Sequence, residues 1–144
     1  MDARLSSVSL RVRGYHLDGY GHVNNARYLE FLEEGRWAYF DERPALAEII
    51  QGGEVAFVAV NLNIDYRRAA VAGEDLEVVT GLAELGSRSA RMHQDIRRAR
   101  DGKTVASADL TFVLLDVAAN KAVTIDGALR DAMAPLVVQE ASDA

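Results

Sequence analysis

A carboxylate and the expected start of a helix lie seven residues apart in the segment HLDGYGHVNNARYLEFLEEGR, residues 16–36. Asp18 opens a turn rich in glycine, and glycines let a backbone bend tightly and let another molecule approach closely. Asn is a preferred N-cap, so a helix is expected to begin at Asn24 or Asn25. The first turn of a helix has unpaired N–H groups and the positive end of the macrodipole. A carboxylate base or nucleophile that faces such an oxyanion site suits the hydrolysis of an acyl group.

The same residues also have a purely structural interpretation. An Asp in a glycine-rich turn commonly serves only to form the turn, and an Asn before a helix commonly serves only as a cap. Local physics alone therefore leaves both interpretations of Asp18 open.

The segment resembles the signature of a known enzyme family. The pattern is D-x-x-G-H-V-N-N-x-x-Y followed by an acidic, aromatic helix that ends in Arg, and the residues in register with it are Asp18, Gly21, His22, Val23, Asn24, Asn25 and Tyr28. It is the signature of hotdog-fold acyl-CoA thioesterases of the 4-hydroxybenzoyl-CoA thioesterase type. With VRGYH before it and VNLNIDYRR after it, the chain is most similar to the bacterial long-chain acyl-CoA thioesterase III group, over residues 10–133.

The resemblance implies a reaction and roles for two residues. The reaction is hydrolysis of an acyl-CoA with a long or medium fatty chain to free fatty acid and CoA. In the family, the aspartate matching Asp18 attacks the thioester or activates the attacking water. The backbone N–H matching Asn25 polarises the thioester carbonyl. Many members have another acidic residue two positions before that aspartate, where this chain has His16, so the local polarity differs here.

Other candidate site residues have weaker patterns. The candidate substrate-binding residues are Gly21, Asn24, Tyr28, Arg67, Arg68 and Arg88. Six basic and two acidic side chains lie between positions 88 and 103, and this local excess of positive charge could attract the phosphates of CoA. The alternative is an ordinary solvated strand face.

His22 is a further candidate for a base, because it lies four residues after Asp18. The spacing resembles, without matching, the Asp-x4-His dyad of hotdog hydratases, where the separation is five. In the other interpretation, His22 only positions the turn.

The protein as a whole has two alternative functions. One is a hydratase or dehydratase that acts on enoyl or hydroxyacyl thioesters, and the other is a non-catalytic acyl-CoA-binding protein.

Composition sets further limits. A chain of 144 residues with 49% hydrophobic residues suits one globular domain, 1–144. Cys is absent, the three His have no ligand spacing, and no P-loop, dinucleotide or G-x-S-x-G motif occurs, so we expect neither a metal nor a cofactor. The net charge of −6 argues against nucleic acid and anionic membrane as partners. Without a signal peptide or a long apolar run, a cytoplasmic protein is expected.

Hydrophobic periodicity predicts the elements that position these residues. Alternation predicts a strand over 7–14, with Val8, Leu10 and Val12 on one side. A helix follows from Asn25 to Phe40, expected at the buried centre of the domain, with one face formed by Tyr28, Leu32, Gly35 and Tyr39. Gly35 is costly inside a helix, and close packing against a sheet would explain it. A short helix is predicted over 44–51, where it would form a wall of the acyl pocket or a plain connector.

The second half of the chain predicts strands. Strict alternation predicts a strand near 58–67 with one apolar face: Val58, Val60, Leu62, Ile64 and Tyr66. Strands are also predicted over 75–85, 88–100 and 104–116, with a hairpin turn at 101–102, and the last strand should be central. Asp126 is expected to cap a helix over 127–133, and the tail 136–144 is expected to fray. His93, in the arginine-rich strand, is interpreted as a surface residue.

This order of elements predicts an α+β protein in which one long helix packs on a curved antiparallel sheet of about five strands. A strand and the long helix are followed by four strands expected to form a meander. The arrangement agrees with the hotdog fold that the resemblance implies. One helix covers only one face of the sheet, so the other face needs a second subunit. We therefore expect a homodimer at least, and the resemblance implies a tetramer with active sites at the dimer interface.

Overall fold

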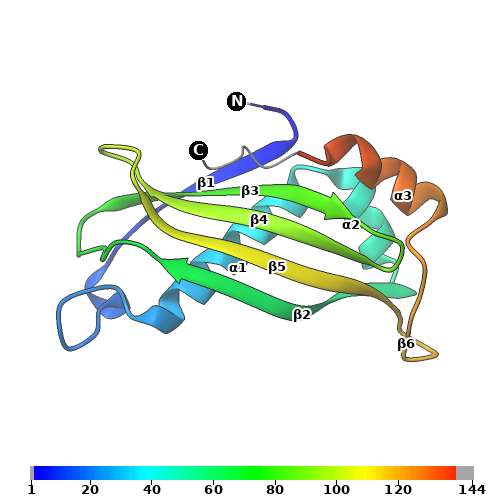
Figure 1. The fold of residues 1–144 in the computed structure, drawn as a ribbon, viewed down its shortest axis with the longest axis horizontal. Helices are drawn as coiled ribbons and strands as arrows, with labels where there is room; N and C mark the ends of the chain where they lie inside the picture. The colour runs from blue at the N-terminus through cyan, green and yellow to red at the C-terminus, as the bar shows by residue number, and fades with distance from the viewer. Residues whose placement is uncertain (1, 139–144) are drawn as a thin grey trace.

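In the computed structural model, which describes residues 2–138, an antiparallel sheet carries a long helix along one face (Figure 1). The strands are β1 (Leu5–Arg11), β2 (Val55–Tyr66), β3 (Asp75–Leu85), β4 (Ser89–Arg98), β5 (Thr104–Asp116) and β6 (Lys121–Ala122). The helices are α1 (Asn25–Asp41), α2 (Pro44–Gln51) and α3 (Gly127–Met133), and short 3-10 turns occupy Gly14–His16 and Ala134–Leu136. The predicted α+β arrangement is confirmed.

The order of strands in the sheet is β1-β3-β4-β5-β2, with β6 paired to β5. The predicted four-strand meander is therefore wrong for β2, which pairs with β5 at the edge opposite β1. Helix α1 crosses the sheet diagonally from the end of β2 to β1, since the Tyr66 hydroxyl donates to the Asn25 carbonyl at its start and Arg43, just past its end, donates to the Leu5 carbonyl (Figure 1). The segment that contains α2 then carries the chain to the edge opposite β1, where β2 lies. The connection after β2 then returns to β1, where the Val12 N–H donates to the Glu74 carbonyl at 2.9 Å. As predicted, β5 is an interior strand.

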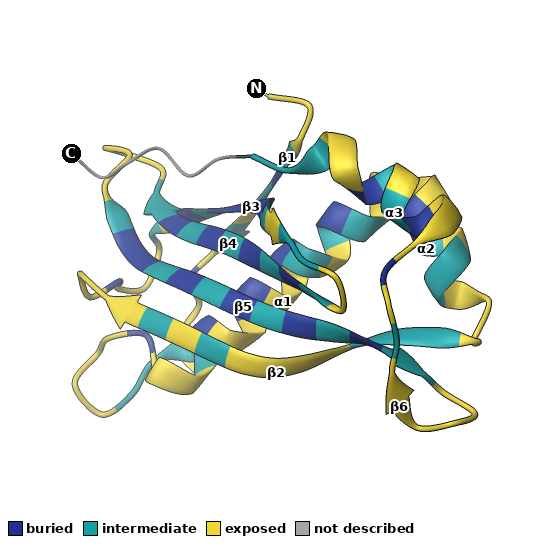
Figure 2. Ribbon diagram, turned by 45° about the vertical axis from the view of Figure 1, so that its right-hand side comes forward, coloured by how far each residue is buried: buried dark blue, intermediate teal, exposed yellow. Residues whose placement is uncertain are grey.

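Helix α1 packs its predicted face on the sheet, and its buried residues are Tyr28, Phe31, Leu32, Gly35 and Tyr39. Its opposite face is open, however, and Trp37 is 61% exposed there. The expectation that α1 forms the buried centre is therefore wrong within one chain, because the sheet reaches the helix from one side only (Figure 2).

Gly35 lies where α1 comes closest to the sheet. A Cβ atom at this position would lie 2.6 Å from Cγ1 of Val78 and 2.9 Å from both Oγ1 of Thr80 and Nε2 of Gln94. All three neighbours are buried. The close packing predicted from the sequence is therefore confirmed.

Gly35→Ala is expected to destabilise the protein by about 2 kcal/mol. The better helix propensity of Ala stabilises the folded state by about 1 kcal/mol, but the overpacked contact between the new Cβ atom and the stiff, buried Val78 side chain destabilises it by up to about 3 kcal/mol. Urea unfolding at one fixed protein concentration measures the difference. The matched control is Gly14→Ala, where a Cβ meets no atom within 4 Å. Equal stability of Gly35→Ala and wild type would contradict this account of the packing.

Strand β2 contains a β-bulge at Val60, which has no partner between the pairs Ala59–Phe112 and Asn61–Thr111. The bulge breaks the predicted alternation. Phe57 packs in the core on the helix side before the bulge, and Leu62 does so after it. Val58 lies 38% exposed on the other side, and Val60 is 56% exposed. The prediction that Val58 and Val60 share a face with Leu62 is therefore wrong, because an extra residue shifts side chains to the opposite face.

The end of the described chain is anchored rather than frayed. Val137 pairs in parallel with Leu82, and the Val138 N–H donates to the Leu82 carbonyl at 2.8 Å. The prediction of a frayed tail is therefore wrong for residues 136–138, and residues 139–144 lie outside the described range. Asp126 occupies the N-cap position of α3, but its side chain makes no capping hydrogen bond. None of the helices within residues 2–138 has the length and apolar character needed to cross a membrane.

Candidate active site

Asp18 lies in a tight turn between two short paired arms that lead into α1. The backbones of Leu17 and Val23 form a bridge, and the Asp18 N–H donates to the His22 carbonyl at 2.8 Å. Oδ1 of Asp18 accepts hydrogen bonds from the N–H groups of Tyr20 at 2.8 Å and His22 at 3.2 Å. Oδ2 receives no donor from residues 2–138. One oxygen thus orients the carboxylate, while the other remains available to a water or a substrate.

Asn24 shapes the start of α1. Its Oδ1 accepts from the Ala26 N–H at 2.9 Å, and its own N–H donates to the His16 carbonyl at 2.9 Å. Asn25 is the first helical residue, and its N–H has no acceptor in the described part of the chain. The predicted start of the helix is confirmed. An unpaired N–H at the positive end of a helix is the kind of donor that stabilises an oxyanion.

Two tyrosines fix this end of the helix to the sheet. Tyr28 is 3% exposed, and burial raises the pKa of its phenol. The Tyr66 hydroxyl donates to the Asn25 carbonyl at 3.3 Å, and its ring packs edge-on against Tyr28 with centroids 5.4 Å apart. The Val23 N–H donates to the Ala70 carbonyl at 2.9 Å. Tyr28 therefore packs beneath the site as a buried structural residue. These contacts hold together the turn, the start of α1 and the end of β2.

The remaining residues of the turn act through their backbones. Gly21 has a φ of 78°, a conformation that favours glycine. The exposed His22 imidazole makes no hydrogen bond with the Asp18 carboxylate. Nδ1 of His16 accepts from the Arg13 N–H at 2.8 Å, and burial lowers the pKa of His16. A neutral imidazole thus stands where many members of the resembling family have a carboxylate.

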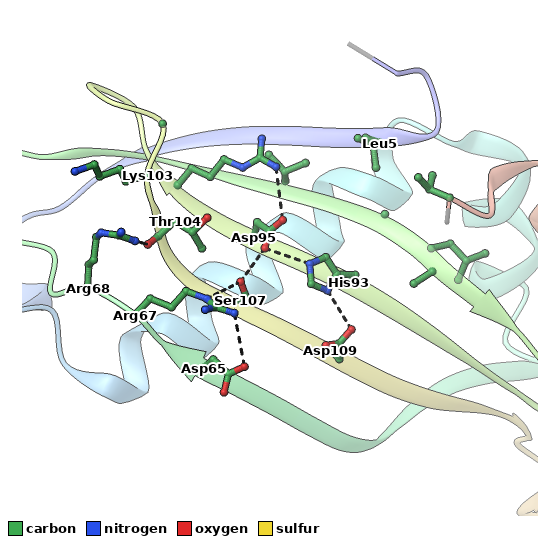
Figure 3. Close-up of a pocket in the computed structure, with 17 residues that line it drawn as sticks. Leu5, Asp65, Arg67, Arg68, His93, Asp95, Lys103, Thr104, Ser107 and Asp109 are labelled. Atoms are coloured by element: carbon green, nitrogen blue, oxygen red, sulfur yellow. Dashed lines mark hydrogen bonds and ion pairs between the residues drawn. The ribbon is translucent and has the colours of Figure 1, made fainter. Parts of the chain in front are cut away.

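The candidate arginines divide between the two ends of the sheet. Arg67 and Arg68 follow β2 at the end where Asn25 lies, and their side chains reach the face opposite α1 (Figure 3). Arg67 donates to Oγ of Ser107 at 3.4 Å. Arg88 lies in the turn between β3 and β4, at the other end. A single chain therefore gathers the other candidate residues at one end of the sheet and leaves Arg88 away from them.

An apolar cavity of about 330 Å³ lies beside α1, α2 and the sheet, and most of its lining was not identified from the sequence, which offered only the helix over 44–51 as a wall of an acyl pocket. Its floor is aromatic: the Phe57 ring lies 4.4 Å from Phe112 and 6.4 Å from Phe40, between centroids. Other residues around it include Ala47, Ile50, Ala59, Met92 and Leu110, with Glu33, Arg36 and Trp37 also lining it. These side chains come from five elements, so no local pattern in the sequence could have grouped them.

His93 was interpreted as a surface residue, but it is half-buried in a charged row on the face opposite α1 (Figure 3). Its Nε2 lies 3.2 Å from Oδ1 of Asp95, and its Nδ1 lies 3.1 Å from Oδ1 of Asp109. The hydrogen bond to Asp95, followed by that to Asp109, raises the pKa of His93 to about 9. The imidazole is therefore charged at neutral pH. No group of three or more His, Asp or Glu side chains within residues 2–138 is arranged to hold a metal ion.

Similarity to known proteins extends over most of the chain. Residues 12–133 match the model of the thioesterase-like superfamily. The long-chain acyl-CoA thioesterase FadM of Escherichia coli K12 is 43% identical over 130 residues, which cover 90% of this chain and 98% of that protein. The L-carnitine dehydrogenase/betainyl-CoA thioesterase of Agrobacterium fabrum is 30% identical over 90% of this chain, but only 26% of that longer protein is matched.

Among solved structures, YbaW of Escherichia coli superposes with a TM-score of 0.79 at 41% identity, over 92% of this chain and 98% of that one. The resemblance read from the D-x-x-G-H-V-N-N segment and the predicted hotdog fold are both confirmed. The chain belongs to the thioesterase-like superfamily of hotdog proteins.

Proposed function

We propose that this protein hydrolyses acyl-CoA thioesters with a long or medium fatty chain and releases a free fatty acid and CoA. The observation that carries the proposal is the unpaired Asn25 N–H at the start of a helix whose preceding turn holds an oriented Asp18 carboxylate. The similarity to a long-chain acyl-CoA thioesterase at 43% identity supports the substrate class.

In the proposed mechanism, the thioester carbonyl accepts a hydrogen bond from the Asn25 N–H. Asp18 takes a proton from a water molecule while the water oxygen attacks the carbonyl carbon. The C–S bond then breaks, and CoA leaves as a thiolate, which takes up a proton. In the other route Asp18 attacks the carbonyl itself, CoA leaves, and water opens the resulting mixed anhydride. In both routes the N–H stabilises the developing oxyanion, which is worth roughly 3 kcal/mol.

The acyl chain is proposed to run along α1 toward the apolar cavity. From Asn25 to Phe40 the helix axis advances about 22 Å at 1.5 Å per residue. An extended chain advances about 1.2 Å per bond, so a sixteen-carbon acyl chain spans roughly 18 Å. The cavity with Phe57 at its floor therefore lies at a depth that suits a long chain. Ala47 and Ile50 line it, in keeping with a role of α2 as a pocket wall.

We further propose that the protein is located in the cytoplasm and forms at least a homodimer, and that it forms a tetramer as the family resemblance implies. The support for subunit association is the exposed apolar surface of a single chain, where Leu29 and Trp37 lie on α1 and Val58 and Val60 lie on the edge strand β2. Sedimentation equilibrium tests the oligomeric state, and a monomer at micromolar concentration would contradict it.

Release of free thiol from a panel of acyl-CoAs, from four to eighteen carbons and one aromatic acyl, tests the proposed reaction. We expect release to peak in one class of chain. A hydratase would instead consume enoyl thioesters and leave the thioester bond intact, and a binding protein would bind acyl-CoA saturably and release no thiol. Either of those results would overturn the proposed hydrolysis.

A further inference from the structure

Two charged side chains in the middle of α1 line the otherwise mainly apolar cavity of about 330 Å³. They are Glu33 and Arg36, which lie three residues apart and are therefore neighbours on one face of the helix. The third charged residue of the lining, Asp41, is the last residue of α1 and lies five positions further along. Ligand cavities are generally apolar with a few polar groups that fix the orientation of the ligand. The placement of Glu33 and Arg36 in this cavity is therefore a candidate determinant of specificity.

A buried amide holds the Arg36 guanidinium in place. Nη1 of Arg36 donates to Oε1 of Gln94 at 3.1 Å. Gln94 is 1% exposed, and its Nε2 donates to the Leu32 carbonyl at 2.8 Å and to Oγ1 of Thr80 at 2.9 Å. Met92, two residues before Gln94 on β4, lines the cavity, and alternate residues of a strand share one face. Gln94 therefore orients Arg36 beside the cavity.

The charges of Arg36 and Glu33 do not neutralise each other by direct contact. Within residues 2–138, the Arg36 guanidinium forms no ion pair with a carboxylate, and Gln94 occupies only one of its N–H groups. Oε1 of Glu33 accepts from Nε1 of Trp37 at 3.3 Å, whereas Oε2 receives no donor from the same part of the chain. Burial lowers the pKa of Arg36, and the charge of Glu33 opposes that shift. The cavity thus contains a donor and an acceptor that are neighbours without touching.

The position of this pair along α1 corresponds to the middle of a long acyl chain. Glu33 and Arg36 lie eight and eleven residues after Asn25, or about 12 and 16 Å along the helix axis. Long side chains of a helix lean toward its N-terminus, so their polar ends lie roughly 9–13 Å from Asn25. At about 1.2 Å per bond, this interval corresponds to roughly the ninth to twelfth carbon of the acyl group. Phe40, four residues beyond Arg36, begins the aromatic floor that can hold the hydrocarbon after it.

We infer that Arg36 and Glu33 bind a hydroxyl group in the middle of the acyl chain, so that the preferred substrates are long-chain hydroxyacyl-CoAs. The Arg36 guanidinium donates to the hydroxyl oxygen, and the hydroxyl donates its hydrogen to Oε2 of Glu33. A neutral group that both accepts and donates suits this pair of opposite charges, whereas a carboxylate would be repelled by Glu33. A plain hydrocarbon would shield both charges from water without replacing their hydrogen bonds. This inference rests on the proposed function and adds to it the substrate class.

Steady-state hydrolysis of three CoA thioesters tests this inference. Their sixteen-carbon chains are plain, hydroxylated at the tenth carbon, or hydroxylated at the terminal carbon. For the wild type, we expect kcat/KM to be roughly tenfold higher with the mid-chain hydroxyl than with either other chain, as one charge-assisted hydrogen bond would give. Arg36→Met should abolish this preference while activity on the plain chain is retained. That retained activity also shows that the variant is folded.

Further variants separate the two charges and control for general effects. Glu33→Gln keeps an acceptor oxygen without its charge and should reduce the preference to about threefold. The matched controls are Glu34→Gln, on α1 but outside the cavity lining, and Arg11→Met on the edge strand β1, and both should keep the full preference. Since Arg36→Met leaves Oε1 of Gln94 without its donor, Arg36→Lys is the second variant. Lysine keeps the charge but not the planar fork, so the preference should fall to about threefold.

The outcomes separate this inference from the proposed function. Equal kcat/KM of the wild type for the plain and mid-chain hydroxylated thioesters would overturn the inference while leaving hydrolysis intact. A preference that is unchanged in Arg36→Met, or that is equally strong for the terminal hydroxyl, would also overturn it. No thiol release from any of the three thioesters would overturn the proposed function itself.

Discussion

Asp18→Asn is expected to lower kcat for acyl-CoA hydrolysis by roughly 10²- to 10³-fold, the usual contribution of a general base or more. The amide oxygen can still accept the hydrogen bonds from Tyr20 and His22, so the turn is retained. What is lost is the negative charge and the basic Oδ2. Thiol release from a long-chain acyl-CoA under saturating conditions measures the effect, and circular dichroism checks that the fold is unchanged.

The chain offers a matched control for this substitution. Oδ1 of Asp116 accepts from the Ala119 N–H at 2.9 Å, so Asp116 also serves as a turn-forming aspartate, in the connection to β6. Asp116→Asn should leave kcat unchanged. Activity of Asp18→Asn within threefold of wild type would show that Asp18, like Asp116, only forms a turn.

Asn25→Pro is expected to reduce kcat by roughly 10²- to 10³-fold through loss of a single hydrogen atom, the N–H that faces the developing oxyanion. Proline is well tolerated at the first position of a helix, where the N–H has no partner inside the helix. The residue before a proline must be extended, and Asn24 already has φ −61° and ψ 138°. The fold should therefore accept the substitution, as a thermal melt would show.

Asn25→Ala is the necessary companion, because it removes the same side chain but keeps the N–H. It should retain nearly all activity. Equal loss in both variants would assign the effect to the Asn25 side chain, and no loss in either would remove this N–H from the mechanism.

The local features of the site were predictable because short segments of sequence determine them. A cap requires only Asn24 and its neighbours, and a turn requires only Asp18 and the glycines after it. The bounds of α2, β3 and β5 were predicted correctly for the same reason. Gly35 was informative because its cost within a helix requires an explanation from packing.

Features that depend on contacts between distant segments were missed. The position of β2 beside β5 depends on the path that the chain takes across the sheet through α1 and α2, which no periodicity encodes. The ion pairs of His93 require Asp109 from the neighbouring strand, so the residue appeared in the sequence as an isolated surface histidine. The anchored tail depends likewise on a single pairing between Leu82 and Val137.

The bulge at Val60 uncouples the length of β2 from the faces that its side chains occupy. Ala59 pairs with Phe112 and Asn61 pairs with Thr111, so these two pairs would follow one another in a regular ladder if Val60 were lost. Phe57 would still pair with Leu114 and would stay in the aromatic floor on the helix side of the sheet. Among related chains, the loss of one residue at this position would thus leave the lining of the apolar cavity unchanged.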